Sequence, residues 1–317
     1  MSELSFVLKK TTELSFEEVT ALVDMFKIVM EHDRTVEVFY NQFLNTPLGY
    51  SFHVLMYDDG VLVGTHTDIP SYFIMDGVKT LFVTGCDTMI MKKHRDIFNY
   101  MEMLAFNKKE MKNLGAVLNY GYPNDLNFKI LTKGKLTTVI GHMYTYCLPF
   151  RIGGIKHGLR CFNWLSQCFC YCWLSVSSIF ASKKVSHFRI EKDLDTFNPC
   201  RYKRNDGNYS IQEGFVYKIM DYEGIRTAFL IDVFEKSPYN FCKAVKYIFK
   251  HEKKNFDILL YPGYLPFSVT GMVRIPHKFE PKHFHMTVGI IDKTAVDKSM
   301  ICDIENWDTN LSNYDLI

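Results

Sequence analysis

The most informative segment of the chain reads Leu81-Phe82-Val83-Thr84-Gly85-Cys86-Asp87-Thr88-Met89-Ile90-Met91, then Lys92-Lys93-His94-Arg95-Asp96. The part up to Met91 is rich in β-branched, aromatic and other apolar side chains, which predicts a strand. Beyond the basic turn, Ile97, Met101 and Leu104 recur at helical spacing, so a helix is expected over 96–112. A long strand therefore passes through a short basic turn directly into a helix.

The chain before this stretch predicts two helices and a hairpin. Ser15 and Glu18 have the spacing of a capping box, which opens the first helix, and apolar spacing places the second over 36–44. Strands are expected over 52–56 and 61–67, on either side of an Asp-Asp-Gly turn that is typical of hairpins.

The chain after this stretch continues the alternation. A strand is expected over 116–121, a short helix over 124–133 that ends at Gly134, and a strand over 139–146. The order is therefore helix, helix, hairpin, strand, helix, strand, helix, strand.

This order resembles the GNAT superfamily of acyl-CoA-dependent acetyltransferases over about 15–151. The Asp87–Met91 strand followed by His94-Arg95 is similar to the family's strand and pyrophosphate turn, and Tyr122-Pro123-Asn124 with Gly134 is similar to its asparagine, helix and closing glycine. The resemblance implies an α+β fold, acetyl-CoA as cosubstrate, and transfer of an acetyl or other short acyl group to an amine.

A cofactor turn must offer backbone N–H groups to a pyrophosphate, and a helix N-terminus supplies them. The resemblance assigns cofactor binding to Met89, Ile90, Met91, Arg95, Asp96, Ile97, Phe98, Asn99 and Asn124. The family's Arg-x-x-Gly-x-Gly turn is here Arg95-Asp96-Ile97-Phe98-Asn99, without a glycine and with a carboxylate near the phosphate position. The alternative is a helix start that Asp96 merely caps.

The resemblance also suggests residues for proton transfer and for the substrate pocket. Asp87 is the candidate general base, and Tyr122 the candidate donor to the thiolate, because Leu131 stands where the family often has a tyrosine. Tyr120 or water are alternatives for that donor. The candidate substrate residues are His53, His66 and Tyr120. Each histidine has an alternative interpretation as a structural side chain.

The second half of the chain echoes the first. The segment 257–264 is similar to 116–123, which favours a duplicated domain, and Glu235-Lys236-Ser237-Pro238 stands where a cofactor turn would lie. The expected organisation is two GNAT-like domains, each a mixed, mostly antiparallel sheet flanked by helices. Their ranges are 1–151 for the acyl-CoA domain, 152–190 for an aromatic interdomain segment, and 191–317 for a degenerate domain that forms a wall of the acceptor site.

The C-terminal Asn306-Trp307-Asp308 and Tyr314-Asp315 resemble the tail of bacterial double-GNAT proteins of surface-polysaccharide clusters. This match suggests an amino sugar as the small-molecule acceptor. Two alternatives stay open: a Fem-type aminoacyl transferase, and a degenerate, non-catalytic GNAT protein that binds a partner or a membrane.

The segment 161–182 holds no charged residue and is rich in aromatic side chains. Basic residues stand on both sides of it. It has three interpretations: a buried interdomain helix, an aromatic segment on a membrane surface, or a membrane span.

Composition and charge set the remaining expectations. Among 317 residues, 37 are Lys or Arg and 35 are Asp or Glu, a balance that excludes strong electrostatic attraction to nucleic acid. The segment 1–10 does not read as a secretion signal, so a cytoplasmic protein with reduced cysteines is expected, with possible peripheral membrane contact. No metal is expected, because neither Cys168-Phe169-Cys170-Tyr171-Cys172 nor His277, His283 and His285 complete a metal motif.

Overall fold

The computed structural model describes residues 4–204, 207–280 and 282–314, and the chain divides into two compact units. Unit 1 combines the chain up to Ile140 with Arg189–Gly207 and Thr287–Cys302. Unit 2 combines Gly141–Phe188, Asn208–Met286 and the chain from Asp303 onward. Each unit is therefore assembled from separate segments, and the expected boundaries at 151 and 190 do not coincide with the transitions between them.

Unit 1 is built on a mixed sheet. Its strands are β1 (Leu4–Lys10), β2 (Phe52–Asp58), β3 (Val61–Met75), β4 (Val78–Ile90), β5 (Leu118–Gly121), β7 (Ile190–Lys192) and the Thr287–Ile290 part of β13 (Phe284–Ile290). The order is β1-β2-β3-β4-β5-β13, with β7 beside the far end of β3. Neighbours run antiparallel except β4 and β5, which run parallel.

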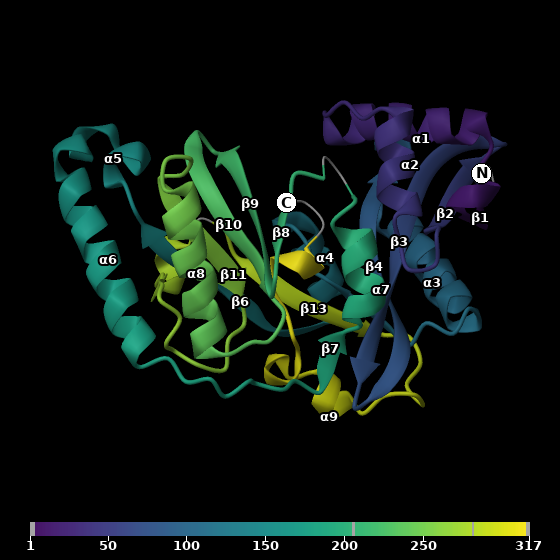
Figure 1. Ribbon diagram of the computed structural model, residues 1–317. Coiled ribbons are helices and arrows are strands. Elements are labelled where there is room, and N and C mark those ends of the chain that lie inside the picture. The colour runs from purple at the N-terminus through teal and green to yellow at the C-terminus, as the bar shows by residue number, and fades with distance from the viewer. Residues whose placement is uncertain (1–3, 205–206, 281, 315–317) are drawn as a thin grey trace. The chain divides into compact units, whose positions relative to one another are not determined.

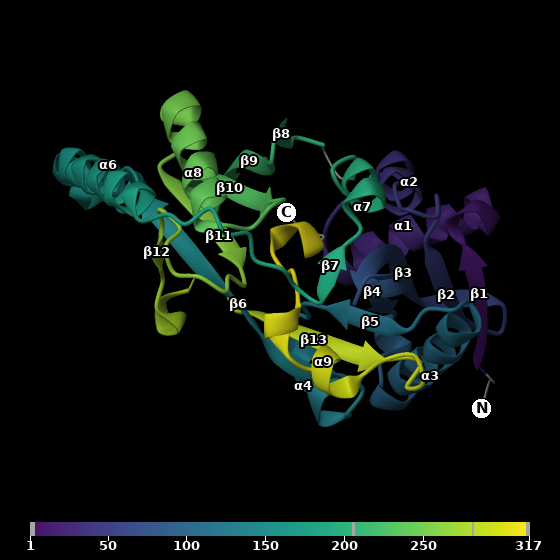
Figure 2. The same ribbon diagram turned by 60° about the horizontal axis from the view of Figure 1, so that its bottom comes forward.

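Helices cover both faces of this sheet. They are α1 (Phe16–Met30), α2 (Val36–Leu44), α3 (Ile97–Asn113), α4 (Asp125–Lys133), α7 (Leu194–Arg201) and α9 (Lys298–Ile301). Figure 2 shows α1 and α2 on one side of the strands and α3 and α4 on the other. The capping box of α1 is confirmed, since Glu18 N donates to Ser15 Oγ and Ser15 N donates to Glu18 Oε2.

The core of unit 1 explains the unbroken apolar stretch in β2. Leu55 packs among the buried side chains of α1 and α2, whereas Val54 and Met56 pack against Met103 of α3. Successive side chains of a strand point to opposite faces, so a strand that is covered on both faces must be apolar at consecutive positions. The two faces are therefore separate environments, and alternate residues along a strand point into one or the other.

Unit 2 has a second mixed sheet. Its strands are β6 (Thr138–Pro149), which begins at the end of unit 1, β8 (Ser210–Gln212), β9 (Phe215–Tyr222), β10 (Ile225–Val233), β11 (Ile258–Gly263) and β12 (Val273–Arg274). The order is β6-β11-β10-β9-β8, with β12 also paired to β6. The helices are α5 (Ile152–Ile155), α6 (Asn163–Ile179) and α8 (Pro238–Glu252). Figure 1 shows α8 lying along the sheet, with α6 beside it. Both units combine helices with a mixed sheet, so the expected α+β class is confirmed.

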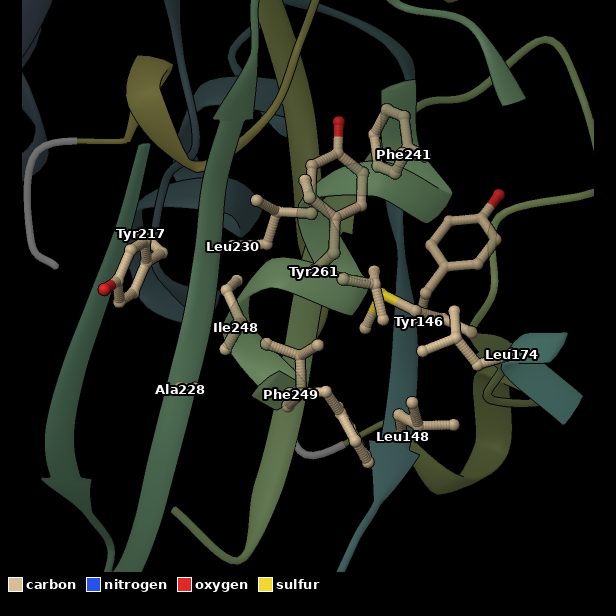
Figure 3. Packing of buried hydrophobic residues seen from close by; sticks show 14 of the residues in the cluster. Tyr146, Leu148, Leu174, Tyr217, Ala228, Leu230, Phe241, Ile248, Phe249 and Tyr261 are labelled. Carbon is tan, nitrogen blue, oxygen red and sulfur yellow. The ribbon is translucent and has the colours of Figure 1, made fainter. Parts of the chain in front are cut away.

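The core of unit 2 lies between α8 and its sheet. Figure 3 shows Ile248 and Phe249 of α8 packed among strand side chains such as Leu148 and Tyr261. In the C-terminal segment, Trp307 has no exposed surface. Asn310 Nδ2 also donates to Asp232 Oδ1 of β10 at 2.6 Å. Of the C-terminal residues noted in the sequence, Asp315 lies outside the described residues.

Helix α6 has an unusual distribution of side chains. The residues that it buries are Ser166, Cys170, Leu174 and Ser177. Its exposed apolar residues, which we name the α6 apolar face, are Trp164, Leu165, Phe169, Tyr171, Trp173, Val176 and Ile179. Helix α6 thus lies within unit 2 and turns most of its large side chains outward, an orientation that does not favour the interpretation as a buried interdomain helix. Within the described ranges, no helix has the length and hydropathy that a membrane span requires.

Candidate functional site

A cavity of about 170 Å³ lies in unit 1 where β4 and β5 separate. Residues Phe82–Thr84 of β4 pair in parallel with Leu118–Tyr120 of β5. The pairing ends there, and the cavity begins immediately beyond. Its lining includes Gly85 and Thr88 of β4, Tyr120 and Gly121 of β5 with Tyr122 and Pro123 after it, Tyr100, Leu104, Asn107 and Lys108 of α3, and Asn127 and Leu131 of α4. The cavity is therefore a slot between the diverging edges of β4 and β5 and the two helices, and Thr287, Gly289 and Ile290 of β13 also line it.

A β-bulge shapes the β4 wall of this slot. The register places Thr65 opposite Met89 and Thr67 opposite Cys86, so His66 alone faces two residues of β4, Asp87 and Thr88. Asp87 takes a positive φ of 45°, which is uncommon for a residue other than glycine. Such a bulge bends the strand and redirects the side chains that follow it.

The redirection explains where Asp87 points. In an uninterrupted strand, Asp87 would share a face with Val83 and Gly85, the face toward α3 and the cavity. Instead its carboxylate forms an ion pair with Arg34, which follows α1, and both side chains are nearly buried, at 12% and 7% exposed. The Arg34 guanidinium is stacked on Phe26 at 3.6 Å from the ring centroid. Asp87 is not among the described residues that line the cavity, and its role as general base stays a prediction.

A buried polar cluster forms the floor of the slot. Asp68 of β3 has no exposed surface, and its carboxylate accepts from Asn107 Nδ2 at 2.6 Å and from Asn119 Nδ2 at 3.2 Å. His66 Nε2 lies 3.4 Å from Asp68 Oδ1, and His66 Nδ1 lies 2.8 Å from Thr88 Oγ1. Five polar side chains thus hold one another in place at the cavity wall.

Gly85 leaves room for the imidazole in this cluster. A Cβ atom at position 85 would lie 3.0 Å from His66 Cε1 and 3.5 Å from Asn119 Nδ2. A side chain there would therefore push against the histidine. Gly85 therefore permits this close approach and does not form a turn.

Three of the side chains that the sequence proposes do line the cavity: His66, Tyr120 and Tyr122. Tyr120 is buried and packs edge-on against Phe73. Asn107 and Asn119 were not predicted from the sequence. A signal existed for Asn107, because it follows Met103 and precedes Met111 at helical spacing, so a polar residue occupies the buried stripe of α3.

His53 lies elsewhere, in the core beneath α2. Its ring nitrogens contact Thr11 Oγ1 at 2.9 Å and Thr67 Oγ1 at 3.0 Å, and its ring stacks on Phe39. Complete burial, with a smaller contribution from the charge of Arg34, lowers the pKa of His53 from 6.5 to about 3. These contacts favour the interpretation of His53 as a structural side chain. In the described structure, no contact of His53 supports its proposed role in substrate binding.

The predicted cofactor residues other than Asn124 lie around the start of α3, and none of the predicted set is in the cavity lining. Asp96 is the N-cap, and its Oδ1 accepts from the backbone N–H of Phe98 and of Asn99, each at 2.9 Å. Arg95 Nε donates to the carbonyl of Ile90 at 3.1 Å. Asp96 thus satisfies two of the donors that a pyrophosphate would need.

The other predicted cofactor residues divide by burial. Met89 and Ile90 are buried in the sheet, Met91 is half-buried, and Ile97 and Phe98 are exposed. Asn124 caps α4 by accepting from Asn127 N at 3.0 Å. The assignment of these residues to cofactor binding stays a prediction.

Comparison with known proteins gives the fold a family context. No protein-family model and no curated protein matches the sequence. Three solved structures are similar to the chain: a GCN5-related N-acetyltransferase from Anabaena variabilis, a probable N-acyltransferase from Enterococcus faecalis, and Eis1 from Mycobacterium abscessus.

The measures of similarity are nearly the same for all three. In the same order, the TM-scores are 0.57, 0.55 and 0.54 and the sequence identities 10%, 11% and 9%. The matches cover 90%, 91% and 93% of this chain and 73%, 73% and 74% of the other chain. At such low identity the similarity concerns the fold, and on that ground the chain has the fold of the GCN5-related N-acetyltransferases.

Proposed function

We propose that the chain is an acyl-CoA-dependent N-acyltransferase that holds the pantetheine arm of its cosubstrate in the slot between β4 and β5. The observation that carries this proposal is the separation of two parallel strands beyond Thr84 and Tyr120, with a cavity at the point of separation. The similarity of fold to N-acetyltransferases supports it.

The slot suits a pantetheine arm chemically. Pantetheine is a narrow chain with two amides, and each amide needs hydrogen-bond partners when it leaves water. The facing edges of β4 and β5 no longer pair with each other at the cavity, so backbone groups there are available to a ligand. Leu104 and Leu131 offer apolar surface to the methylene groups between the amides.

The reaction asks little of the protein, because a thioester is already activated. The amine nitrogen attacks the thioester carbonyl and loses a proton, the carbon–sulfur bond breaks, and the thiolate takes up a proton. We propose Tyr122 as the donor of that proton, since it lines the cavity at the end of β5. His66, held by Asp68 and Thr88, would face the acceptor side.

The finer assignments rest on the sequence resemblance. We propose an acetyl or other short acyl group as the donor portion and an amino sugar of a surface polysaccharide as the acceptor. We also propose that unit 2, whose sheet carries no comparable turn at 235–238, contributes to acceptor selection and not to cosubstrate binding.

Calorimetry with acetyl-CoA tests the cavity assignment. In Leu131→Trp, a larger side chain fills the slot, and we expect a loss of affinity of at least tenfold, which corresponds to ~1.4 kcal/mol. Lys129→Trp adds the same side chain to the exposed side of the same helix and should bind as the wild type does. Equal affinity of the two variants would place the cosubstrate elsewhere.

A second candidate function is a non-catalytic binding protein with this fold. The observation that favours it is the Asp96 carboxylate, which caps α3 where the resemblance places the pyrophosphate. If the wild type produces no heat with acetyl-CoA at millimolar concentration, this second function replaces the first.

We further propose that unit 2 contacts an anionic membrane surface through the α6 apolar face. Seven large apolar side chains project from a helix without a charged residue. Exposed Lys156 and Arg160 precede this helix, and exposed Lys183 and Lys184 follow it. An apolar helix face with cations at both ends fits acyl chains and anionic headgroups together.

Sedimentation with vesicles tests this contact. The protein should sediment with vesicles that contain phosphatidylserine, less with neutral vesicles, and less at high salt. Trp164→Ser with Phe169→Ser should abolish sedimentation, whereas Phe16→Ser, which removes an exposed aromatic ring of α1, should not. If the double variant changes only the oligomeric state in light scattering, the face binds a second copy of the chain and the membrane proposal fails.

A further inference from the structure

Three side chains of unit 2 gather at one place although they are distant in sequence. His142 belongs to β6, whereas His277 and Glu280 belong to the short helical turn that precedes β13. One potential ligand atom from each of the three lies within 4.8 Å of the other two. A third histidine, His283, adjoins them, since the rings of His277 and His283 are 4.1 Å apart.

The carboxylate at the centre is fixed in position. Glu280 has a fully buried side chain, and its Oε1 accepts from the backbone N–H of Thr145 at 2.8 Å. Its Oε2 lies 2.8 Å from His277 Nδ1 and 3.5 Å from His283 Nδ1. One carboxylate oxygen therefore orients the group, and the other faces two imidazoles.

The nitrogen that completes the set has no partner. His142 Nε2 is buried, and no described residue accepts or donates a hydrogen bond at this atom. A buried ring nitrogen without a partner is costly, because it has lost its water without compensation. An ion at the centre of the group would supply the missing interaction.

We propose that His142, His277 and Glu280 bind a divalent transition-metal ion, with zinc as the best match and His283 as a fourth ligand. Imidazole nitrogens and a carboxylate oxygen are the donors that zinc takes in proteins. Two ligand atoms of one tetrahedral zinc ion lie ~3.4 Å apart, since each bond is ~2.1 Å. The three ligand atoms lie within 4.8 Å of one another, so small side-chain rotations are enough to bring them to this geometry.

The fold gives the site a structural consequence. The ion would tie the 277–280 turn to β6 and add its binding free energy to the stability of unit 2. This inference is independent of the acyltransferase proposal, because none of these residues lines the cavity of unit 1.

Titration of the purified full-length chain with Zn²⁺ and with Co²⁺ tests the site. We expect one ion per chain, a visible absorption spectrum of tetrahedral Co²⁺, and a higher melting temperature with zinc. His142→Ala and His277→Ala should each weaken zinc binding at least tenfold and remove the thermal shift. His251→Ala, which changes an exposed histidine of α8, should leave both unchanged.

Two results would overturn the proposal. One is the absence of stoichiometric binding to the wild type at micromolar zinc. The other is a Co²⁺ spectrum with thiolate charge-transfer bands, since exposed Cys161, Cys168 and Cys172 would then hold the ion. Because the histidine variants are compared with the wild type both with and without zinc, a loss of stability without metal is distinguished from a loss of the site.

Discussion

Asp87 illustrates how one inserted residue changes the chemistry of a side chain. The bulge in β4 turns the carboxylate from the cavity face to Arg34, so the ion pair and the predicted general base are competing roles for one group. Removal of one partner of a buried pair leaves the other charge uncompensated. We therefore expect Asp87→Asn and Arg34→Gln each to lower the free energy of unfolding by about 3–5 kcal/mol in urea titrations.

Turnover separates the two roles of Asp87. If the carboxylate serves the ion pair only, both variants should lose similar activity. A loss on the order of 10²-fold in Asp87→Asn, without a matching loss in Arg34→Gln, would instead support the general base.

His53 gives the protein a pH dependence of stability. Its pKa is about 3 in the folded state against 6.5 as the ordinary value, so the unfolded chain takes up the proton first as the pH falls. Stability is therefore lost below pH ~6.5, by about 2 kcal/mol at pH 5. Urea unfolding at pH 7 and pH 5 measures the difference. His53→Asn should reduce it, whereas the exposed His32→Asn should retain it, and equal pH dependence in all three proteins would contradict this origin.

At the scale of elements, the sequence predicted α1 and α2 closely, because capping and periodicity are local signals. It also predicted the β4-to-α3 transition. It did not predict the bulge, because a bulge depends on the register with β3, which no local pattern encodes. His66 was proposed for the site, but its partners Asp68 and Asn107 come from a strand and a helix whose relative position only the fold determines.

The N-terminus of α3 offers a sharp test of the cofactor turn. Asp96 both caps the helix and carries a negative charge. Asp96→Asn keeps a capping oxygen and removes the charge, whereas Asp96→Gly removes both and costs the helix only a few tenths of a kcal/mol. If pyrophosphate binds there, the glycine variant should bind acetyl-CoA more tightly, by ~1 kcal/mol, because it frees two N–H donors as well.

Calorimetry on both Asp96 variants measures this effect. An equal gain in both variants would assign the effect to charge, whereas a gain in the glycine variant alone would assign it to the two freed N–H donors. Unchanged affinity in both variants would place the pyrophosphate away from α3.

At the scale of the whole molecule, unit 1 depends on chain that lies far from its main segment. Thr287–Ile290 pairs with β5, and Ile190–Lys192 pairs with β3. The fragment 1–151 retains the strands expected from the sequence but loses both additions and exposes the edge of β5. We expect this fragment to be poorly soluble or to lack a cooperative thermal transition.

Co-expression of 1–151 with 189–302 provides the comparison for this experiment. The second fragment carries both missing strands and should restore soluble material. A fragment 1–151 that melts cooperatively by itself would show that the added strands are dispensable. The sequence could not predict this assembly, because no local pattern in 287–290 indicates which strand this segment pairs with.

The outward orientation of α6 also sets the reactivity of its thiols. Cys168 and Cys172 are exposed on that helix, with Cys161 just before it, whereas Cys170 is buried and burial raises its pKa to about 12. Alkylating reagents attack the thiolate, so the folded protein should be modified rapidly at the three exposed positions and slowly at Cys170. The rate of alkylation at each cysteine thus measures how exposed that part of α6 is. A polarity-sensitive dye attached to Cys168 would change its emission colour when the surrounding aromatic rings leave water.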